Sequence, residues 1–233
     1  MVASIDPLCK NNYSQRHAVR TYNHSMTSLR AEEDANRLVR TLGPLPEPLN
    51  DPFMILISGL PGSGKSYLAR KLSELLGSAI LQSDALRKTL VTKPDYTPAE
   101  SGRLFRAMHF LAEGLLSRGI PVTIDATNII ESNRRGFYRV ADALGARLFI
   151  IQARAPKKVI KARLQSRKRE YGQKSDADWG VYQKMAAEAE KIKRPHISVD
   201  TSKSLEPFIT KIVQEIKNTA TITSSLKGGP DAD

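Results

Sequence analysis

One stretch of the sequence restricts the possible folds of this chain more than any other. In it, an apolar run is followed directly by a glycine-rich segment and then by a helical pattern. Residues 53–58 read FMILIS, as expected of a strand that is buried on both faces. Residues 59–66 read GLPGSGKS and match the pattern G-x-x-x-x-G-K-[ST]. Leucine and alanine then recur at helical spacing over 67–76, and Gly77 ends the pattern. This order predicts a strand–turn–helix unit of a parallel α/β fold.

Each part of segment 59–66 suits the binding of phosphate. Glycines let backbone N–H groups turn inward around phosphate oxygens, and the helix that follows aims its positive end at the same anion. Lys65 can reach the β- and γ-phosphates, and the Ser66 hydroxyl can ligate Mg²⁺. The alternative is a glycine-rich turn without a ligand. The pattern predicts ATP and Mg²⁺ as cofactors, with nucleotide-binding residues Gly59, Pro61, Gly62, Ser63, Gly64, Lys65 and Ser66.

The length of 233 residues fits one α/β domain with short extensions. Residues 43–48 read GPLPEP, and their prolines predict an extended linker. We expect an N-terminal extension over 1–50, a main domain over 51–217 and a disordered tail over 218–233. The chain before Met26 is polar and has no apolar segment of a secretory signal. Because helical sequence begins just after Met26, we hypothesise that it is the true start, which intact-mass analysis would test.

Strands and helices alternate along the main domain, which predicts a parallel sheet with helices on both faces. Strands are expected at 53–58, 79–82, 121–125, 147–152 and 196–199. Helices are expected at 27–42, 67–76, 97–117, 132–144, 157–171, 178–193 and 205–217.

Composition and charge narrow the cellular setting and the partners. The only cysteine is Cys9, which excludes an intrachain disulfide and favours a reducing, cytoplasmic compartment. No apolar run is long enough to span a membrane. Residues 147–217 carry a net charge of +9, out of +12 for the whole chain. This charge predicts a polyanionic partner, and both nucleic acid and a nucleoside triphosphate fit it.

Asp84 and Arg87 follow the second predicted strand, in the segment SDALR. Ligands of open α/β sheets lie at the carboxyl ends of the strands. A carboxylate there can accept the proton of an attacking hydroxyl. If a helix begins at Asp84, Arg87 lies on the same face, where it can hold an acceptor phosphate or stabilise transferring charge. A helix cap followed by a surface arginine is the alternative.

The segment Asp125-Ala126-Thr127-Asn128 closes the third predicted strand. Asp125 can hold the Mg²⁺ shell, and Thr127 and Asn128 can position the acceptor or a phosphate. The alternative is an Asx-type turn that leaves the strand. Many ATPases place a glutamate at the end of an apolar strand, in the pair Asp-Glu, where it activates water. This chain has no apolar strand that ends in Asp-Glu. This absence favours transfer to a hydroxyl other than water.

Arginines gather in or just before the predicted basic helix 157–171. Arg163 and Arg167 are four residues apart, so they share a face. A helix that closes over a bound triphosphate can use both to neutralise the γ-phosphate, and it can also exclude water. The alternative is a solvated basic face. The segment Asp200-Thr201-Ser202 follows the fifth predicted strand. We expect it either to line an adenine pocket or to cap the last helix.

Taken together, these motifs resemble the P-loop kinases related to polynucleotide kinase and the predicted ATP-binding kinases of the AAA_33 type, and more distantly the gluconate kinases and zeta-toxin kinases. The resemblance covers roughly residues 52–217. It rests on Gly59–Ser66, Ser83-Asp84-x-x-Arg87, Asp125–Asn128 followed by Arg134 and Arg135, and Ala155-Pro156 with Arg163, Arg167 and Ser175–Asp178.

The resemblance implies a three-layer P-loop fold with strand order 2-3-1-4-5 and a helical lid at about 154–180. It also implies that Asp84 is the base, Arg87 the acceptor-side arginine and Arg167 a lid contact to phosphate. We therefore expect an ATP-dependent kinase whose catalytic residues are Lys65, Asp84, Arg87 and Arg167. The acceptor is a small hydroxylated metabolite or a nucleic-acid 5′ end. The alternative function is a nucleotide-gated binding or regulatory protein with negligible transfer.

Overall fold

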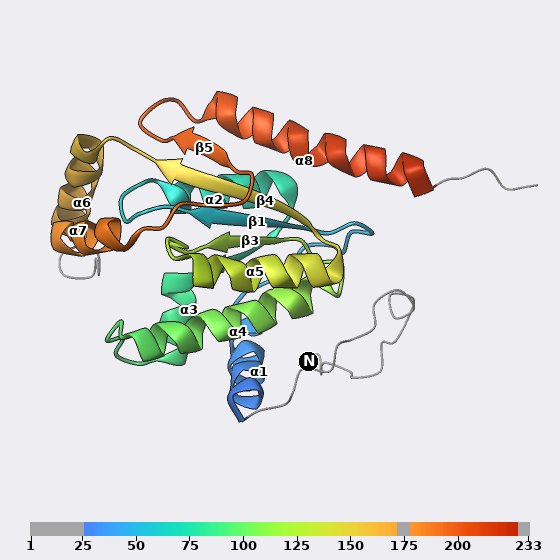
Figure 1. Cartoon of the computed structure of the whole chain (residues 1–233), viewed down its shortest axis with the longest axis horizontal. Coiled ribbons are helices and arrows are strands. Elements are labelled where there is room, and N and C mark those ends of the chain that lie inside the picture. The colour runs from blue at the N-terminus through green and yellow to red at the C-terminus, as the bar shows by residue number, and fades with distance from the viewer. Residues whose placement is uncertain (1–25, 172–177, 228–233) are drawn as a thin grey trace, which may run out of the picture.

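The computed structural model describes the backbone of residues 26–171 and 178–227, and the side chains of 29–166 and 178–218. Its five strands form one parallel sheet in the order β2-β3-β1-β4-β5 (Figure 1). The strands are β1 (Phe53–Ser58), β2 (Ala79–Gln82), β3 (Val122–Asp125), β4 (Arg147–Arg154) and β5 (Ile197–Asp200). This topology confirms the predicted fold class and strand order.

Helices cover both faces of the sheet and form the three predicted layers. On one face, α2 (Lys65–Leu76) and α8 (Glu206–Lys227) share an apolar cluster with β1, β4 and β5. On the other face, α4 (Pro98–Leu116) and α5 (Glu131–Leu144) form a second cluster with β1, β2 and β3. Every residue of the central strand β1 is buried, which explains its continuous apolar sequence.

Two further helices build the side of the molecule next to β2. Helix α3 (Ser83–Leu90) follows β2 directly, and α1 (Met26–Val39) packs against α4 and α3. The buried carboxylate of Asp34 accepts two hydrogen bonds of 2.6 Å from the Arg103 guanidinium on α4. In the linker, the Leu49 N–H donates to the Gly119 carbonyl at 2.7 Å. Residues 29–49 of the predicted extension therefore pack onto the main domain.

Helices α6 (Lys157–Tyr171) and α7 (Trp179–Glu188) lie at the edge of the sheet toward which the strands point (Figure 1). They share a small apolar cluster of Ile160, Leu164 and Tyr182, against which Leu60 packs. Because Leu60 belongs to segment 59–66, α6 and α7 rest directly on the predicted phosphate-binding loop. That these two helices act as a lid stays a prediction.

Two helices end five or more residues away from the position that the sequence predicts. Helix α7 ends at Glu188 instead of residue 193, because Arg134 binds the carbonyls of Glu190 and Lys191 and the Glu190 N–H binds the Ile129 carbonyl. These bonds compete with helical ones. Helix α8 continues to Lys227 instead of ending at 217, and so includes part of the predicted disordered tail. After Pro207 in its first turn, the helix contains no glycine or proline, and the next one is Gly228.

Candidate functional site

The loop formed by residues 59–66, here called the P-loop, has a backbone that requires glycine at two positions. Gly62 has φ +76° and Gly64 has φ +84°, which side chains rarely adopt. A Cβ atom on Gly62 would also lie 3.0 Å from Cγ2 of Ile160, and one on Gly64 would lie 2.9 Å from Oγ1 of Thr201. Both glycines therefore permit the left-handed turn and the close contact with neighbouring elements.

Arg163 and Thr201 hold the outer side of the P-loop, and we call this pair the P-loop clamp. The Thr201 hydroxyl donates to the Ser63 carbonyl at 2.7 Å. The Arg163 guanidinium donates to the Gly62 carbonyl at 3.3 Å, to the Thr201 hydroxyl at 2.9 Å and to the Thr201 carbonyl at 2.6 Å. These bonds fix the carbonyls of Gly62 and Ser63 from outside the loop.

The clamp differs from what the sequence predicts for these two residues. Arg163 is expected to contact the nucleotide, and that contact stays a prediction, because the three hydrogen bonds described for its guanidinium go to protein acceptors. Thr201 is 4% exposed, and it contacts the P-loop although it lies far from the loop in the sequence. No local pattern indicates such a contact, so sequence reasoning could not find it.

Asp125 lies at the carboxyl end of β3, paired in register with Ile57 of β1 and Gln82 of β2. Its Oδ1 accepts a hydrogen bond of 3.2 Å from the Ser66 hydroxyl, and its Oδ2 accepts one of 3.2 Å from the Gln82 amide. Burial raises the pKa of Asp125, whereas the charge of Lys65 and the bond from Ser66 act in the opposite direction. The sequence predicts that Asp125 and Ser66 lie together at a magnesium site, but it does not predict the hydrogen bond from Gln82 to Asp125.

The Ser66 hydroxyl and the Asp125 carboxylate fit a magnesium ion. Both are oxygen donors, and their 3.2 Å separation places them at one point of the sheet edge. Within the described residues, no group of three or more His, Cys, Asp and Glu side chains could hold a metal. This sparse donor set suits Mg²⁺, which usually keeps several waters and is completed by substrate phosphates.

Asp84 occupies the first turn of α3, just beyond the carboxyl end of β2, and its side chain is exposed. Its negative charge raises the pKa of Asp125, while the positive charge of Lys65 lowers it. Both residues are therefore close enough to Asp125 to affect its ionisation. The structure brings Lys65, Ser66, Asp84 and Asp125 together at one edge of the sheet, as the sequence predicts.

Arg87 lies one turn further along α3, but its side chain is occupied. It is buried, forms an ion pair with Glu100 and donates to the Ser101 hydroxyl at 3.3 Å. Its guanidinium carbon also lies 4.7 Å from the centre of the Tyr96 ring. A role of Arg87 at an acceptor phosphate stays a prediction, since in this structure its partners are protein groups.

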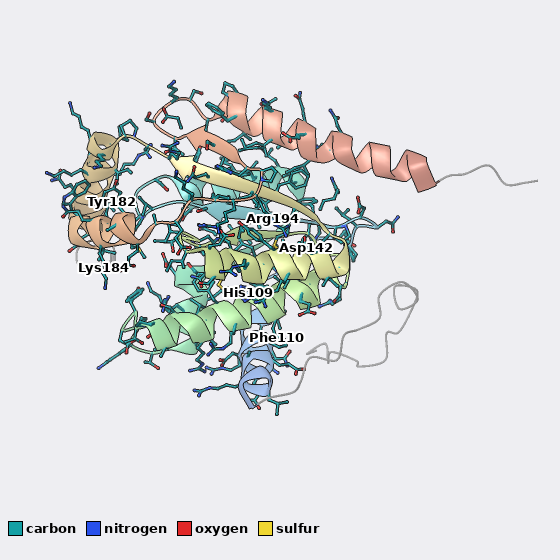
Figure 2. The ribbon with its side chains drawn as sticks, viewed as in Figure 1. His109, Phe110, Asp142, Tyr182, Lys184 and Arg194 are labelled. Atoms are coloured by element: carbon teal, nitrogen blue, oxygen red, sulfur yellow. The ribbon has the colours of Figure 1, made fainter. Side chains whose placement is uncertain are left out.

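The remaining polar residues after β3 connect elements to one another. The Asn128 amide donates to the Ile57 carbonyl at 2.8 Å, and the Asn128 carbonyl accepts from Arg134 at 2.7 Å. Arg134 is fully buried and also pairs with Glu131. Nearby, Arg194 donates two hydrogen bonds to Asp142 on α5, at 2.9 and 2.6 Å (Figure 2). These contacts fasten the segment after α7 to α5.

Two hollows lie beside the carboxyl end of β4, and Arg154 and Ala155 line both. One, of about 370 Å³, lies between the ends of β4 and β5 and is lined by Arg154, Pro156 and Asp200, among others. The other, of about 310 Å³, lies between the P-loop and helices α6 and α7 and is lined by Leu60 and Tyr182, among others. Trp179 stacks on Tyr182 at 4.7 Å and belongs to the lid's apolar cluster.

Some predicted positions fall outside the description. The side chain of Arg167, on α6, lies outside the described residues, as do residues 172–177, which include most of the segment Ser175–Asp178 on which the family resemblance partly rests. Asp178 is described, and it caps α7 by accepting a hydrogen bond of 2.9 Å from the Val181 N–H. No described helix is both long enough and apolar enough to cross a bilayer.

A five-stranded parallel sheet of order 2-3-1-4-5, with this loop between β1 and α2, defines the P-loop class of α/β proteins. The family described as "AAA domain" (AAA_33) matches residues 54–192, which is more than half of the chain, and the chain belongs to that family. No curated protein is similar enough in sequence to count as a match.

Solved structures with the same fold include several kinases. The chain is similar to the APS kinase CysC of Mycobacterium tuberculosis, solved with AMPPNP and APS, with 21% identity and a TM-score of 0.54 over 73% of this chain and 99% of that one. A gluconokinase of Sinorhizobium meliloti has 17% identity and a TM-score of 0.54, over 76% and 98% of the two chains. Kti12 of Chaetomium thermophilum, solved with ADP-AlF3, has 15% identity and a TM-score of 0.57, over 71% and 97%. At these identities the likeness establishes the fold alone.

Proposed function

We propose that this protein is an ATP-dependent phosphotransferase that moves the γ-phosphoryl group of ATP to an alcohol. The observation that carries the proposal is the grouping of Lys65, Ser66, Asp84 and Asp125 at one sheet edge, beside a clamped P-loop. A phosphate cradle, a site for Mg²⁺ and an exposed carboxylate are the parts that phosphoryl transfer to a hydroxyl needs. Kinases with the same fold support this proposal.

The P-loop and Lys65 bind the triphosphate in this proposal. N–H groups on the inner side of the loop surround the β-phosphate, and Lys65 neutralises charge on the β- and γ-phosphates. Ser66 and Asp125 hold Mg²⁺, which when bound offsets the charge that develops on the phosphate oxygens. The hollow between the ends of β4 and β5 is the place we assign to the base of ATP, next to Arg154 and Asp200.

Asp84 acts on the acceptor. It accepts the proton of the acceptor hydroxyl as the oxygen of that hydroxyl forms a bond to the γ-phosphorus. The bond between the γ-phosphorus and the β–γ bridging oxygen breaks, and ADP leaves. Asp84 suits this role because its side chain is exposed, whereas Asp125 is buried and bound to Ser66 and Gln82. The lid helices α6 and α7 exclude water, which is the competing acceptor.

The test is a comparison of wild type with Asp84→Asn in two assays on the full chain. A fluorescent ATP analogue measures nucleotide binding. Mass spectrometry measures phosphorylated products after incubation with MgATP and either a metabolite extract or a 5′-hydroxyl oligonucleotide. We expect Asp84→Asn to bind nucleotide like wild type and to transfer phosphate at least 100-fold more slowly, the lower range for loss of a general base.

Two outcomes would contradict the proposal. If wild type binds nucleotide but modifies no acceptor, the nucleotide-gated binding protein becomes the better account. If Asp84→Asn forms product at the wild-type rate, Asp84 is not the base. Lys65→Ala is the complementary variant, and we expect it to lose nucleotide binding and transfer together.

A further inference from the structure

Helix α3 carries Asp84 in its first turn, so the contacts that hold α3 also set the place of the proposed base. The helix follows β2, which is the outermost strand on its side of the described sheet. The principal neighbours of α3 are β2, α4 and α1. Because no strand of the described sheet lies beyond β2 to support it, the position of α3 depends strongly on the two helices.

Helix α1 precedes residues 54–192, the segment that matches the family, yet it packs into the main domain. Four residues on one face of this helix are buried, and they have the spacing of a helical stripe: Ala31, Asp34, Ala35 and Leu38. The last two belong to the same apolar cluster as Leu86 of α3 and Leu104 of α4. Figure 1 shows α1 beside α4, on the side away from α5. Helix α1 is thus part of the packing around α3.

Asp34 fixes the orientation of α1 on α4. Its carboxylate accepts hydrogen bonds of 2.6 Å from both Nε and Nη2 of Arg103, and only 4% of the Asp34 side chain is exposed. A bidentate pair restrains direction as well as distance, because rotation of either partner breaks both bonds. The pair therefore holds α1 and α4 at a set angle more strictly than apolar contacts do.

The first turn of α4 holds α3. The carboxylate of Glu100 pairs with Arg87, and the Ser101 hydroxyl accepts a hydrogen bond of 3.3 Å from the same guanidinium. Arg37 on α1 completes the arrangement, because it donates a hydrogen bond of 3.2 Å to the Thr89 carbonyl of α3. The three helices are thus tied to one another pairwise. Loosening the contact between α1 and α4 removes support from α3 on two sides.

We propose that α1 belongs to the acceptor side of the site, and that Asp34 is a positioning residue that sets the place of the Asp84 carboxylate through α4 and α3. The inference rests on the proposed function, with Asp84 as the base. The P-loop clamp consists of Arg163 and Thr201, which lie on other elements, so ATP binding is independent of Asp34. Loss of the pair between Asp34 and Arg103 should therefore separate phosphoryl transfer from nucleotide binding.

The experiment compares wild type, Asp34→Asn and the matched control Asp51→Asn, each as the full chain. Asp51 forms an ion pair of 2.9 Å with Arg147 at the start of β4, at the opposite edge of the sheet. Titration with a fluorescent ATP analogue counts the sites that bind nucleotide and gives their Kd. Transfer from MgATP to a 5′-hydroxyl oligonucleotide or to a metabolite extract is then expressed per nucleotide-binding site, so that unfolded protein is not counted.

We expect Asp34→Asn to keep the Kd for the ATP analogue and to lower transfer per site by about tenfold or more, since a displacement of about 1 Å can cost about 100-fold. Asp51→Asn should match wild type in both. A merely structural role of Asp34 predicts fewer nucleotide-binding sites, each as active as in wild type.

The double variant Asp34→Leu/Arg103→Met removes the pair without leaving a buried charge. It should fold like wild type, because apolar side chains often replace a buried ion pair without loss of stability. It should still transfer slowly, because apolar contacts do not restrain the angle between α1 and α4. This variant tests the inference even where Asp34→Asn does not fold.

Hydrogen exchange measured by mass spectrometry, with AMPPNP bound, tests the inference without any transfer. Amides of α3 should exchange about tenfold faster or more in the Asp34 variants, whereas those of α2 should be unchanged. Three results overturn the inference: α3 exchange equal to wild type, equal acceleration in α2 and α3, or wild-type transfer per site in both Asp34 variants. If wild type modifies no acceptor, the proposed function fails, and the exchange of α3 still decides whether Asp34 holds that helix.

Discussion

Replacement of Thr201 by valine removes one hydroxyl from the P-loop clamp and keeps the shape of the side chain. The hydroxyl donates to the Ser63 carbonyl at 2.7 Å and accepts from Arg163 at 2.9 Å, and both bonds would be lost. Gly64 packs directly against Thr201, and the valine would preserve that contact. The variant thus tests whether the orientation of the P-loop peptides depends on hydrogen bonds from outside the loop.

The two bonds set the size of the effect. A neutral hydrogen bond contributes about 0.5–1.5 kcal/mol, and one from a charged donor about 1.5–3 kcal/mol. Their loss therefore weakens the clamp by about 2–4.5 kcal/mol, shared between the free energy of unfolding and the affinity for ATP. If about 1.4 kcal/mol of this appears in affinity, the Kd for ATP rises tenfold.

Urea unfolding with and without MgATP separates the two shares. At an ATP concentration of about 100 times the wild-type Kd, ATP should stabilise wild type by about 2.7 kcal/mol. The same concentration is about ten times the Kd of Thr201→Val, so the stabilisation should fall to about 1.4 kcal/mol. Thr201→Ser keeps the hydroxyl and should behave like wild type.

Thr123→Val is the matched control, because Thr123 is also buried and its hydroxyl bonds to Ser78 at 2.7 Å within the core. It should lower the free energy of unfolding without changing the stabilisation by ATP. The reasoning is refuted if ATP stabilises Thr201→Val as much as wild type. It is also refuted if Thr201→Ser is as defective as Thr201→Val.

Two further predictions concern the core. Burial lowers the pKa of His109 from 6.5 to about 4. Between pH 4 and 6.5 the unfolded chain therefore binds more protons than the folded chain. The free energy of unfolding should decrease by about 3 kcal/mol as the pH falls from 6.5 to 4. Urea unfolding across this range should show the decrease in wild type and a flatter curve in His109→Gln, and equal curves would contradict the prediction. Arg134→Met leaves Glu131 and three carbonyls without their buried partner, and it should lower the free energy of unfolding by about 3–5 kcal/mol. Arg194→Met breaks a half-exposed ion pair with Asp142, and it should lower the free energy of unfolding by at most about 1 kcal/mol. Similar losses in the two arginine variants would show that burial does not determine their importance.

The sheet and its active edge were predictable because their signals are local. The apolar run of β1 identifies a doubly buried strand, and the carboxyl ends of β2 and β3 place Asp84 and Asp125 at one edge. Parallel pairing brings such strand ends together whatever the details of packing. The sequence therefore predicted that Lys65, Ser66, Asp84 and Asp125 lie together beside the P-loop, but it did not predict the contacts of Gln82 and Thr201 there.

Long-range contacts account for what the sequence could not predict. Thr201 reaches Ser63 across 138 residues, and Arg134 ends α7 by binding carbonyls more than 50 residues away. Its spacing from Asp84 predicts that Arg87 binds a ligand, whereas in the structure Arg87 forms an ion pair with Glu100 on the next helix. Such pairings depend on how helices pack, which hydrophobic periodicity does not specify.

The central claim is that the γ-phosphoryl group goes to an alcohol and not to water. The most direct test follows the label from [γ-³²P]ATP with Mg²⁺, and measures how much appears on an added acceptor and how much as inorganic phosphate. The account predicts that label appears on an acceptor alcohol, that Asp84→Asn abolishes it, and that little inorganic phosphate forms. Label that appears only as inorganic phosphate, at a rate independent of any acceptor and of Asp84, would contradict the account.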